Sequence, residues 1–149
     1  PGTFDPVTLG HVDIINRALP LFDKIIVGIG LNTSKAPMFS PQQRLDWIKE
    51  IYKDEERVEG AVYEGLTINF CQKLGAHFIL RGIRYVSDFE YEKTIADANR
   101  TLDKTIETIF LTGEPKYTSV ASTIVRDIIR NGGDASHFLP ESVFKSLPK

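Results

Sequence analysis

Cysteine is nearly absent from this sequence, and its scarcity limits both the location and the chemistry of the protein. Cys71 is the only cysteine among 149 residues, so no disulfide can form within the chain. A single thiol is typical of a reducing compartment, and we expect a cytoplasmic protein. Cys71 lies in an apolar stretch of helical spacing, which favours a buried structural thiol over a nucleophile.

The sequence also lacks a long apolar run, a signal peptide and an excess of basic charge. No run approaches the roughly 20 residues of a membrane-spanning helix. The 18 Lys and Arg residues and 20 Asp and Glu residues give a net charge of −2, which provides no positive field for a nucleic-acid backbone. We therefore expect neither a nucleic acid nor a membrane as partner, and favour small phosphorylated ligands. No His, Cys, Asp and Glu residues have the spacing of zinc ligands.

The length of the chain is sufficient for one compact domain, which we expect to span 1–149. Such a domain buries about two-thirds of its unfolded surface. Strand-like and helix-like segments alternate as in repeated β-α-β units, which predicts an α/β protein with a doubly wound parallel sheet in three layers, α/β/α. Predicted strands span 24–30, 58–63, 77–80 and 108–111. Predicted helices follow His11 and the N-cap Ser40, span 67–74, run from a Ser87-x-x-Glu90 capping box to Leu102, and span 119–130 and 140–147.

The first twelve residues, PGTFDPVTLGHV, form the most informative pattern. A turn rich in Gly and Pro leads through Thr8-x-Gly10-His11 into an apolar-periodic stretch that predicts an amphipathic helix. The N-terminus of a helix offers free N–H groups and partial positive charge, and Gly10 has no side chain to keep a phosphate away. An imidazole at His11 would be well placed to contact a reacting phosphate at this helix N-terminus. The alternative is a polar side chain that is solvated on the first helical turn, which is the more common case for a lone His. Because a buried strand should precede such a loop, we expect about half a dozen strand residues upstream of Pro1.

A second pattern, RGIRYVSDFEYE, places two arginines directly after a predicted strand. Arg81 and Arg84 are three residues apart and separated by a glycine, so both guanidinium groups can point into one cleft and bind phosphate in bidentate fashion. The alternative is a solvated loop in which these arginines pair with Asp88 and Glu90.

Together the two patterns resemble a known family. PGTFDPxTxGH is similar to the signature of the (H/T)xGH nucleotidylyltransferase superfamily, and with RGxRxxxDFEYE it resembles the bacterial phosphopantetheine adenylyltransferases. The resemblance continues through NTSKAPMF at 32–39 and GDxxHFLP at 133–140 and covers essentially the whole chain. It implies a Rossmann-like, HUP-type fold. It also implies transfer of the adenylyl group of ATP to 4′-phosphopantetheine, giving 3′-dephospho-coenzyme A and pyrophosphate, the penultimate step of coenzyme A synthesis.

The chemistry of that reaction explains why the sequence shows no nucleophilic triad. The attacking phosphate oxygen is already ionised at neutral pH, so in-line geometry and neutralisation of charge are what remain for the protein. The resemblance assigns these tasks to His11, Lys35 and Arg84. The metal that we expect is Mg²⁺ arriving with ATP, held mostly by phosphates and water.

The resemblance also implies a binding role for each matching residue. Thr3 would contact both reacting phosphates and Lys35 would lie between the two substrates, while Thr67 and Arg81 would bind the phosphopantetheine arm. The residues implied at the ATP site are Thr3, Phe4, His11, Gly82, Ile83, Arg84, Glu92, Tyr117, Thr118, Ser119, Val120, Ala121, Ser122 and Thr123. The last four depart from the commoner ISSS pattern of the family, because Ala121 lacks one hydroxyl.

Two other functions compete with this interpretation. A cytidylyltransferase or a nicotinamide-mononucleotide adenylyltransferase would share the TxGH or HxGH motif, but the RGIRYVSDFEYE block argues against both. A non-catalytic nucleotide-binding regulatory module would tolerate the loss of His11, Lys35 and Arg84, and all three are present.

The family resemblance finally implies a homohexamer that coenzyme A inhibits as a feedback ligand. The segment 88–102 presents Phe89, Tyr91, Ile95 and Ala98 on more than one helical face. This is more apolar surface than a helix covering one sheet needs, and we expect it to serve a subunit interface. The alternative is that both faces are buried within one subunit.

Overall fold

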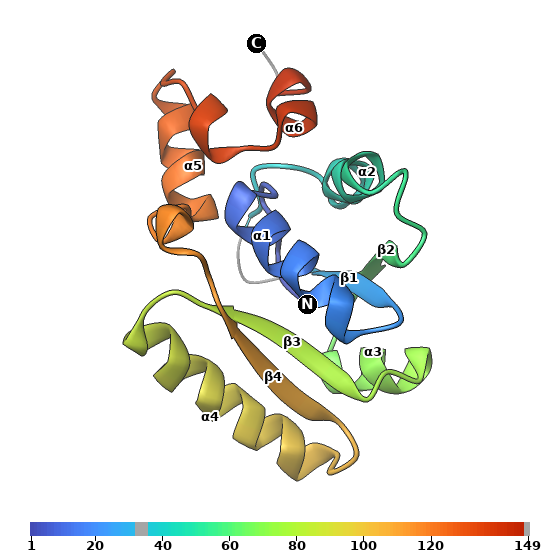
Figure 1. The fold of residues 1–149 in the computed structure, drawn as a ribbon. Helices are drawn as coiled ribbons and strands as arrows, with labels where there is room; N and C mark the ends of the chain where they lie inside the picture. The colour runs from blue at the N-terminus through green and yellow to red at the C-terminus, as the bar shows by residue number, and fades with distance from the viewer. Residues whose placement is uncertain (32–35, 148–149) are drawn as a thin grey trace.

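Parallel strands alternate with helices in the computed structural model, which describes residues 1–31 and 36–147 (Figure 1). The strands are β1 (Ile25–Gly30), β2 (Val58–Tyr63), β3 (Phe78–Ile83) and β4 (Glu107–Thr112). The helices are α1 (Leu9–Ala18), α2 (Pro41–Ile51), α3 (Thr67–Leu74), α4 (Val86–Leu102), α5 (Ser122–Arg130) and α6 (Glu141–Lys145). Short 3₁₀ turns occur at Leu19–Leu21, Pro115–Tyr117 and Ser136–Phe138. The predicted α/β alternation is confirmed.

The four strands form two parallel pairs. β1 pairs with β2 from Ile25 opposite Val58 onwards, and β3 pairs with β4 from Phe78 opposite Glu107 onwards. Gly2 adds a parallel bridge to β1, since its N–H donates to the carbonyl of Gly28 and its carbonyl accepts from the N–H of Gly30, both at 2.9 Å.

Contacts of the first two residues place them between the strand pairs. Gly2 is hydrogen-bonded to β1, and Pro1 accepts a hydrogen bond from the Arg81 side chain on β3. Among the described residues the strands therefore form two pairs joined through this segment, where the sequence predicted one sheet. The strand expected upstream of Pro1 stays a prediction.

Local signals at two helix ends behave as predicted. The Ser40 side chain accepts a hydrogen bond from the N–H of Gln43 at 3.1 Å, and Pro41 occupies the first position of α2. α3 ends at Gly75, whose φ of 64° lies in the left-handed region that glycine adopts without strain.

The predicted starts of α4 and α5 are wrong. α4 begins at Val86, because the Asp88 carboxylate accepts from the N–H groups of Arg84 (3.0 Å) and Tyr85 (3.3 Å) and so caps the helix before Ser87 can do so. α5 begins at Ser122 instead of residue 119, because the preceding residues form the tight turn that follows the 3₁₀ segment. The terminal helix is also shorter than predicted, at Glu141–Lys145.

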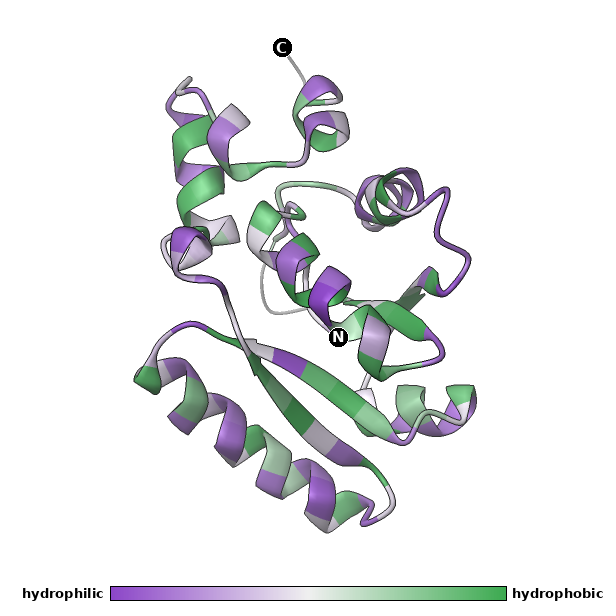
Figure 2. Ribbon diagram, in the orientation of Figure 1, coloured by the Kyte–Doolittle hydropathy of each residue, from purple (hydrophilic) through white to green (hydrophobic). Residues whose placement is uncertain are grey.

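The main hydrophobic core lies between β1 and the helices α1, α2, α5 and α6. Its members are apolar side chains from all of these elements, and hydrophobic and hydrophilic residues alternate along the helix ribbons (Figure 2). Trp47 of α2 packs edge-on against Phe39, with ring centroids 4.8 Å apart, and donates its indole N–H to the Ser146 hydroxyl at 2.6 Å. α2 is thereby joined to the C-terminal end of the described chain.

A smaller core lies between α3 and β3, and α4 covers the β3–β4 pair on the far side from α1 (Figure 1). None of the 17 residues of α4 is buried within the subunit. Exposed apolar side chains on this helix include Val86, Phe89, Tyr91, Ile95 and Leu102.

Candidate functional site

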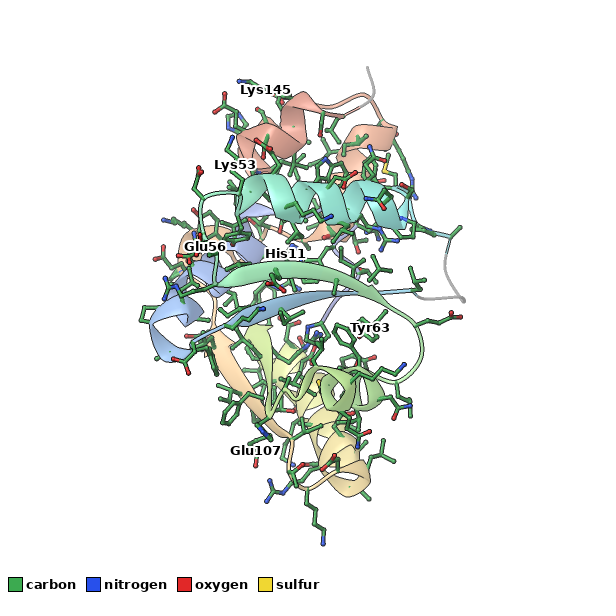
Figure 3. The ribbon with its side chains drawn as sticks, turned by 90° about the vertical axis from the view of Figure 1, so that its right-hand side faces the viewer. His11, Lys53, Glu56, Tyr63, Glu107 and Lys145 are labelled. Atoms are coloured by element: carbon green, nitrogen blue, oxygen red, sulfur yellow. The ribbon has the colours of Figure 1, made fainter. Side chains whose placement is uncertain are left out.

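A cleft of about 1280 Å³ runs between β1 and β3, from the residues that precede these strands to the loops beyond their carboxyl ends. The loop Thr3–Asp5, the start of α1, the end of β3 and the start of α5 contribute polar side chains to its wall. The end of the cleft beyond the carboxyl ends of the strands is where a doubly wound fold is expected to bind its ligand. His11 lies near the middle of the molecule, whereas Lys53 and Lys145 lie at its periphery (Figure 3).

His11 is held in one orientation at the N-terminus of α1. Its Nδ1 lies 3.0 Å from the N–H of Thr8, which donates to it, and 3.0 Å from the Thr8 hydroxyl. Because Nδ1 accepts a hydrogen bond from the backbone N–H of Thr8, the neutral ring carries its proton on Nε2. The ring also packs against Phe4, with centroids 4.9 Å apart. His11 therefore acts as a fixed hydrogen-bond donor in the cleft wall.

The surroundings of His11 keep the imidazole uncharged. Burial lowers the pKa of His11 from 6.5 to about 4, and the positive charges of Arg84 and Arg81 add to the effect. At neutral pH the ring is neutral and donates from Nε2 without changing its charge.

Arg84 connects the end of β3 to the segment before α5. Its Nε lies 3.3 Å from the Asp88 carboxylate, and its Nη1 donates to the carbonyl of Val120 at 3.4 Å. The ion pair with Asp88 that the sequence raised as an alternative does form. Arg84 nevertheless lines the cleft beside His11, so pairing and ligand binding are compatible.

Arg81 points to a different part of the site. Its guanidinium makes a two-point contact with Glu92, Nε to Oε2 at 2.8 Å and Nη2 to Oε1 at 2.6 Å. Arg81 and Glu92 line both the main cleft and a second cavity of about 660 Å³. Thr67 lines the same two cavities, and its hydroxyl lies 2.8 Å from that of Tyr63.

The residues before and at the start of α5 contribute unevenly. Tyr117, Val120, Ala121, Ser122 and Thr123 line the cleft. The Ser122 hydroxyl donates to the carbonyl of Pro6 at 2.8 Å, so it holds α5 on the N-terminal loop.

The structure gathers most of the predicted site residues. Those that line the main cleft are Thr3, Phe4, His11, Thr67, Arg81, Gly82, Ile83, Arg84, Glu92, Tyr117, Val120, Ala121, Ser122 and Thr123. Thr118 and Ser119 are not among its lining residues. Lys35 lies outside the described residues. Close packing also requires glycine at position 82, because a Cβ there would come within 2.9 Å of the Ile14 side chain on α1.

Charged residues of the cleft that were not predicted as site residues from the sequence include Asp5, Arg44 and Arg126. Asp5 stands inside the PGTFDP motif, whereas the arginines belong to no motif. The one signal for Arg44 is its position four residues before Ile48, which puts a charge on the apolar side of a helix.

The described residues include neither a membrane-spanning helix nor a cluster of metal ligands. Across 1–31 and 36–147, no helix is both long enough and apolar enough to cross a membrane. The same residues contain no group of three or more His, Cys, Asp or Glu side chains placed to hold a metal ion.

The chain is similar to proteins of known family. Residues 1–128 match the model of the family described as cytidylyltransferase-like. A phosphopantetheine adenylyltransferase of Flavobacterium psychrophilum is 58% identical over 96% of this chain and 94% of the relative. The proteins of that name from Bacteroides thetaiotaomicron and Lachnoclostridium phytofermentans are 50% and 43% identical, over 96% and 99% of this chain and 94% and 90% of their own.

One solved structure supports the fold alone. The lipopolysaccharide core biosynthesis protein of Thermoplasma volcanium superimposes with a TM-score of 0.56 at 21% identity, over 76% of this chain and 93% of that protein.

Proposed function

Because this chain belongs to the phosphopantetheine adenylyltransferase family, within the cytidylyltransferase-like proteins, we propose how its cleft carries out the family's reaction. The enzyme transfers the adenylyl group of ATP to 4′-phosphopantetheine and releases pyrophosphate, giving 3′-dephospho-coenzyme A. A phosphate oxygen of the acceptor attacks the α-phosphorus of ATP, and the bond to pyrophosphate breaks on the opposite side. The observation that carries this proposal is the placement of a neutral His11 beside Arg84 at a helix N-terminus.

The donor atoms of the cleft suit the charge that develops in such a transfer. His11 presents Nε2–H, α1 presents the free N–H groups of its first turn, and Arg84 supplies a permanent positive charge. Donors that are fixed before the reaction stabilise the crowded α-phosphate without reorganising. Thr3 is exposed at the edge of both cavities, a position that supports contact with both reacting phosphates.

The second cavity supports a separate place for the acceptor. Arg81 would bind the phosphate of 4′-phosphopantetheine, and Thr67 with Tyr63 would line the path of its arm. Glu92 already holds the Arg81 guanidinium by two hydrogen bonds, so the fork is oriented before the acceptor arrives. Lys35, which lies outside the described residues, remains proposed between the two substrates on the family resemblance.

Mg²⁺ fits this cleft as an ion that ATP brings with it. Two carboxylates of the cleft, Asp88 and Glu92, already accept hydrogen bonds from Arg84 and Arg81. Phosphate and water oxygens would therefore make up most of its coordination, and the ion would supply charge neutralisation to the triphosphate.

Assembly and location complete the proposal. We expect a homohexamer in the cytoplasm, with the exposed apolar side chains of α4 at a subunit interface and coenzyme A as a feedback inhibitor. The absence of any buried residue on α4 supports the interface, and the single cysteine supports a reducing compartment.

Pyrophosphate release measured with each substrate alone and with both together tests the reaction. We expect release to require ATP and 4′-phosphopantetheine together. His11→Ala should lower kcat about 100-fold or more, the usual cost of removing one transition-state donor, with the KM for ATP within a few-fold. His137→Ala is the matched control, because that exposed imidazole lies outside both cavities.

Other outcomes would contradict the proposal. Turnover with CTP in place of ATP, or with nicotinamide mononucleotide in place of 4′-phosphopantetheine, would indicate the related transferases. A folded protein that binds ATP without turnover would be a regulatory module.

A further inference from the structure

The turn Thr3–Asp5 carries an uncommon backbone conformation beside the reacting groups. Phe4 has a φ of 49°, and it is the one non-glycine residue with positive φ among the residues that the structure describes. A side chain in the left-handed region is strained and persists only where the surroundings enforce it. Phe4 is buried and its ring contacts His11, so this conformation fixes how the two rings meet.

Two arginines from different helices hold the carbonyl groups on either side of Phe4. Arg44 of α2 donates from Nη1 to the carbonyl of Thr3 at 2.7 Å, and Arg126 of α5 donates from Nη1 to the carbonyl of Asp5 at 2.6 Å. Hydrogen bonds from a charged donor are about twice as strong as neutral ones. The Thr3–Phe4 peptide and the Asp5–Pro6 peptide are therefore each held by one arginine.

Each arginine is itself held in place. The Arg44 residue is 2% exposed and also donates from Nε to the carbonyl of Ser40 at 3.3 Å. Arg126 has a side chain that is 22% exposed and donates from Nη2 to the Thr123 hydroxyl at 3.2 Å. Their guanidinium planes are thus not free to follow a change in the turn.

The Asp5 side chain completes the arrangement. Its two oxygens accept from the N–H groups of Met38 and Phe39, each at 2.9 Å, and one oxygen lies 3.8 Å from Arg126. The turn is consequently tied to the chain that leads into α2 as well as to α2 and α5.

We propose that Arg44 and Arg126 are positioning residues that hold the Thr3–Asp5 turn in its left-handed conformation and so place His11 and Thr3 against the reacting phosphates. Neither arginine acts on the substrates; each acts through a backbone carbonyl next to Phe4. The catalytic consequence rests on the proposed function, while the effect on the turn does not.

The test uses Arg126→Gln, because Arg126 is partly exposed and its loss leaves the buried Arg44 intact. We expect kcat to fall about 10- to 100-fold, the scale of a misplacement near 1 Å, with the KM for each substrate within about three-fold. Arg126→Lys should recover part of the loss, since it keeps one charged donor. Arg57→Gln is the matched control: Arg57 also donates to a backbone carbonyl, that of Leu19 at 3.3 Å, but lies outside the cleft.

A readout without turnover separates this proposal from the proposed function. The Phe4 ring lies against His11, so relaxation of the turn should move the NMR resonances of the His11 ring in Arg126→Gln and leave those of His137 in place. If the parent enzyme has no transferase activity, the proposed function fails while this shift is still measured. The positioning role is overturned by unchanged His11 resonances, by a raised KM for ATP with intact kcat, or by lowered thermal stability with unaltered catalysis.

Discussion

At the scale of single residues, the neutral state of His11 decides how the cleft stabilises charge. The uncharged and already oriented ring offers Nε2–H to a phosphate oxygen with no change in its protonation state. Positive charge comes instead from Arg84, whose guanidinium stays protonated at any physiological pH. In the proposed mechanism His11 thus donates the hydrogen bond, and Arg84 neutralises the negative charge of the phosphates.

The titration of His11 gives a prediction for the free protein. NMR of labelled histidine should show a ring that carries its proton on Nε2 and becomes charged only near pH 4, since burial and two arginines lower its pKa to about 4. Between pH 6.5 and 4 the His11 ring binds a proton in the unfolded chain but not in the folded protein. The free energy of unfolding therefore falls as pH falls through this window. A ring protonated on Nδ1, or a midpoint at 6.5, would refute this assignment.

Sequence motifs identify the residues that we propose to contact ligand more readily than they identify the residues that support them. His11, Arg81 and Arg84 could be predicted because each stands in a short pattern whose chemistry is local. Arg44 and Arg126 could not, because their partners lie 41 and 121 residues away along the chain. Contacts of that separation exist only once the helices have packed.

At the scale of elements, the end of β3 directs two arginines to two different proposed ligand positions. Arg81 lies on the strand and turns towards Glu92 of α4, while Arg84 lies just beyond it and reaches the segment before α5. Arg81 lines both cavities, and Arg84 lines only the larger among those described. One strand end thus places an arginine at each of the two proposed substrate positions.

Substitution of each arginine should raise a different KM. Arg81→Gln should raise the KM for 4′-phosphopantetheine and Arg84→Gln that for ATP, each about ten-fold or more, as expected for a charged hydrogen bond worth roughly 1.5–3 kcal/mol. Steady-state titration of each variant with each substrate measures the split. Arg100→Gln, which changes an exposed arginine of α4 paired with Glu107, is the control. Equal defects in both KM values for both variants would contradict the division.

Element boundaries were predictable where one local signal acts alone. Ser40 and Pro41 fix the start of α2, and Gly75 fixes the end of α3. At α4 the capping patterns 85–88 and 87–90 overlap, and the carboxylate of Asp88 prevails over the hydroxyl of Ser87. The start of α5 depends on the turn before it, in which the N–H of Val120 donates to the carbonyl of Tyr117, and the sequence pattern contains no signal for that turn.

At the scale of the whole molecule, α4 leaves apolar side chains without cover inside the subunit. Sedimentation equilibrium at micromolar protein should give a mass of six times 16.8 kDa. Leu102→Glu should lower that mass, because it puts a charge on the proposed interface. Leu21→Glu is the matched control, since Leu21 and Leu102 are both 59% exposed and Leu21 lies outside α4. A parent protein of 16.8 kDa would reject the assembly.

The contact between Trp47 and Ser146 also gives the molecule a single optical reporter. Trp47 is the only tryptophan of the chain, it is buried between α2 and the C-terminal end, and it is not among the residues that line either described cavity. Its fluorescence will therefore shift to longer wavelength when α6 leaves α2 and water reaches the indole. Nucleotide entering the cleft will leave the emission unchanged, so detachment of the C-terminal helix can be followed in the presence of ATP without interference from binding.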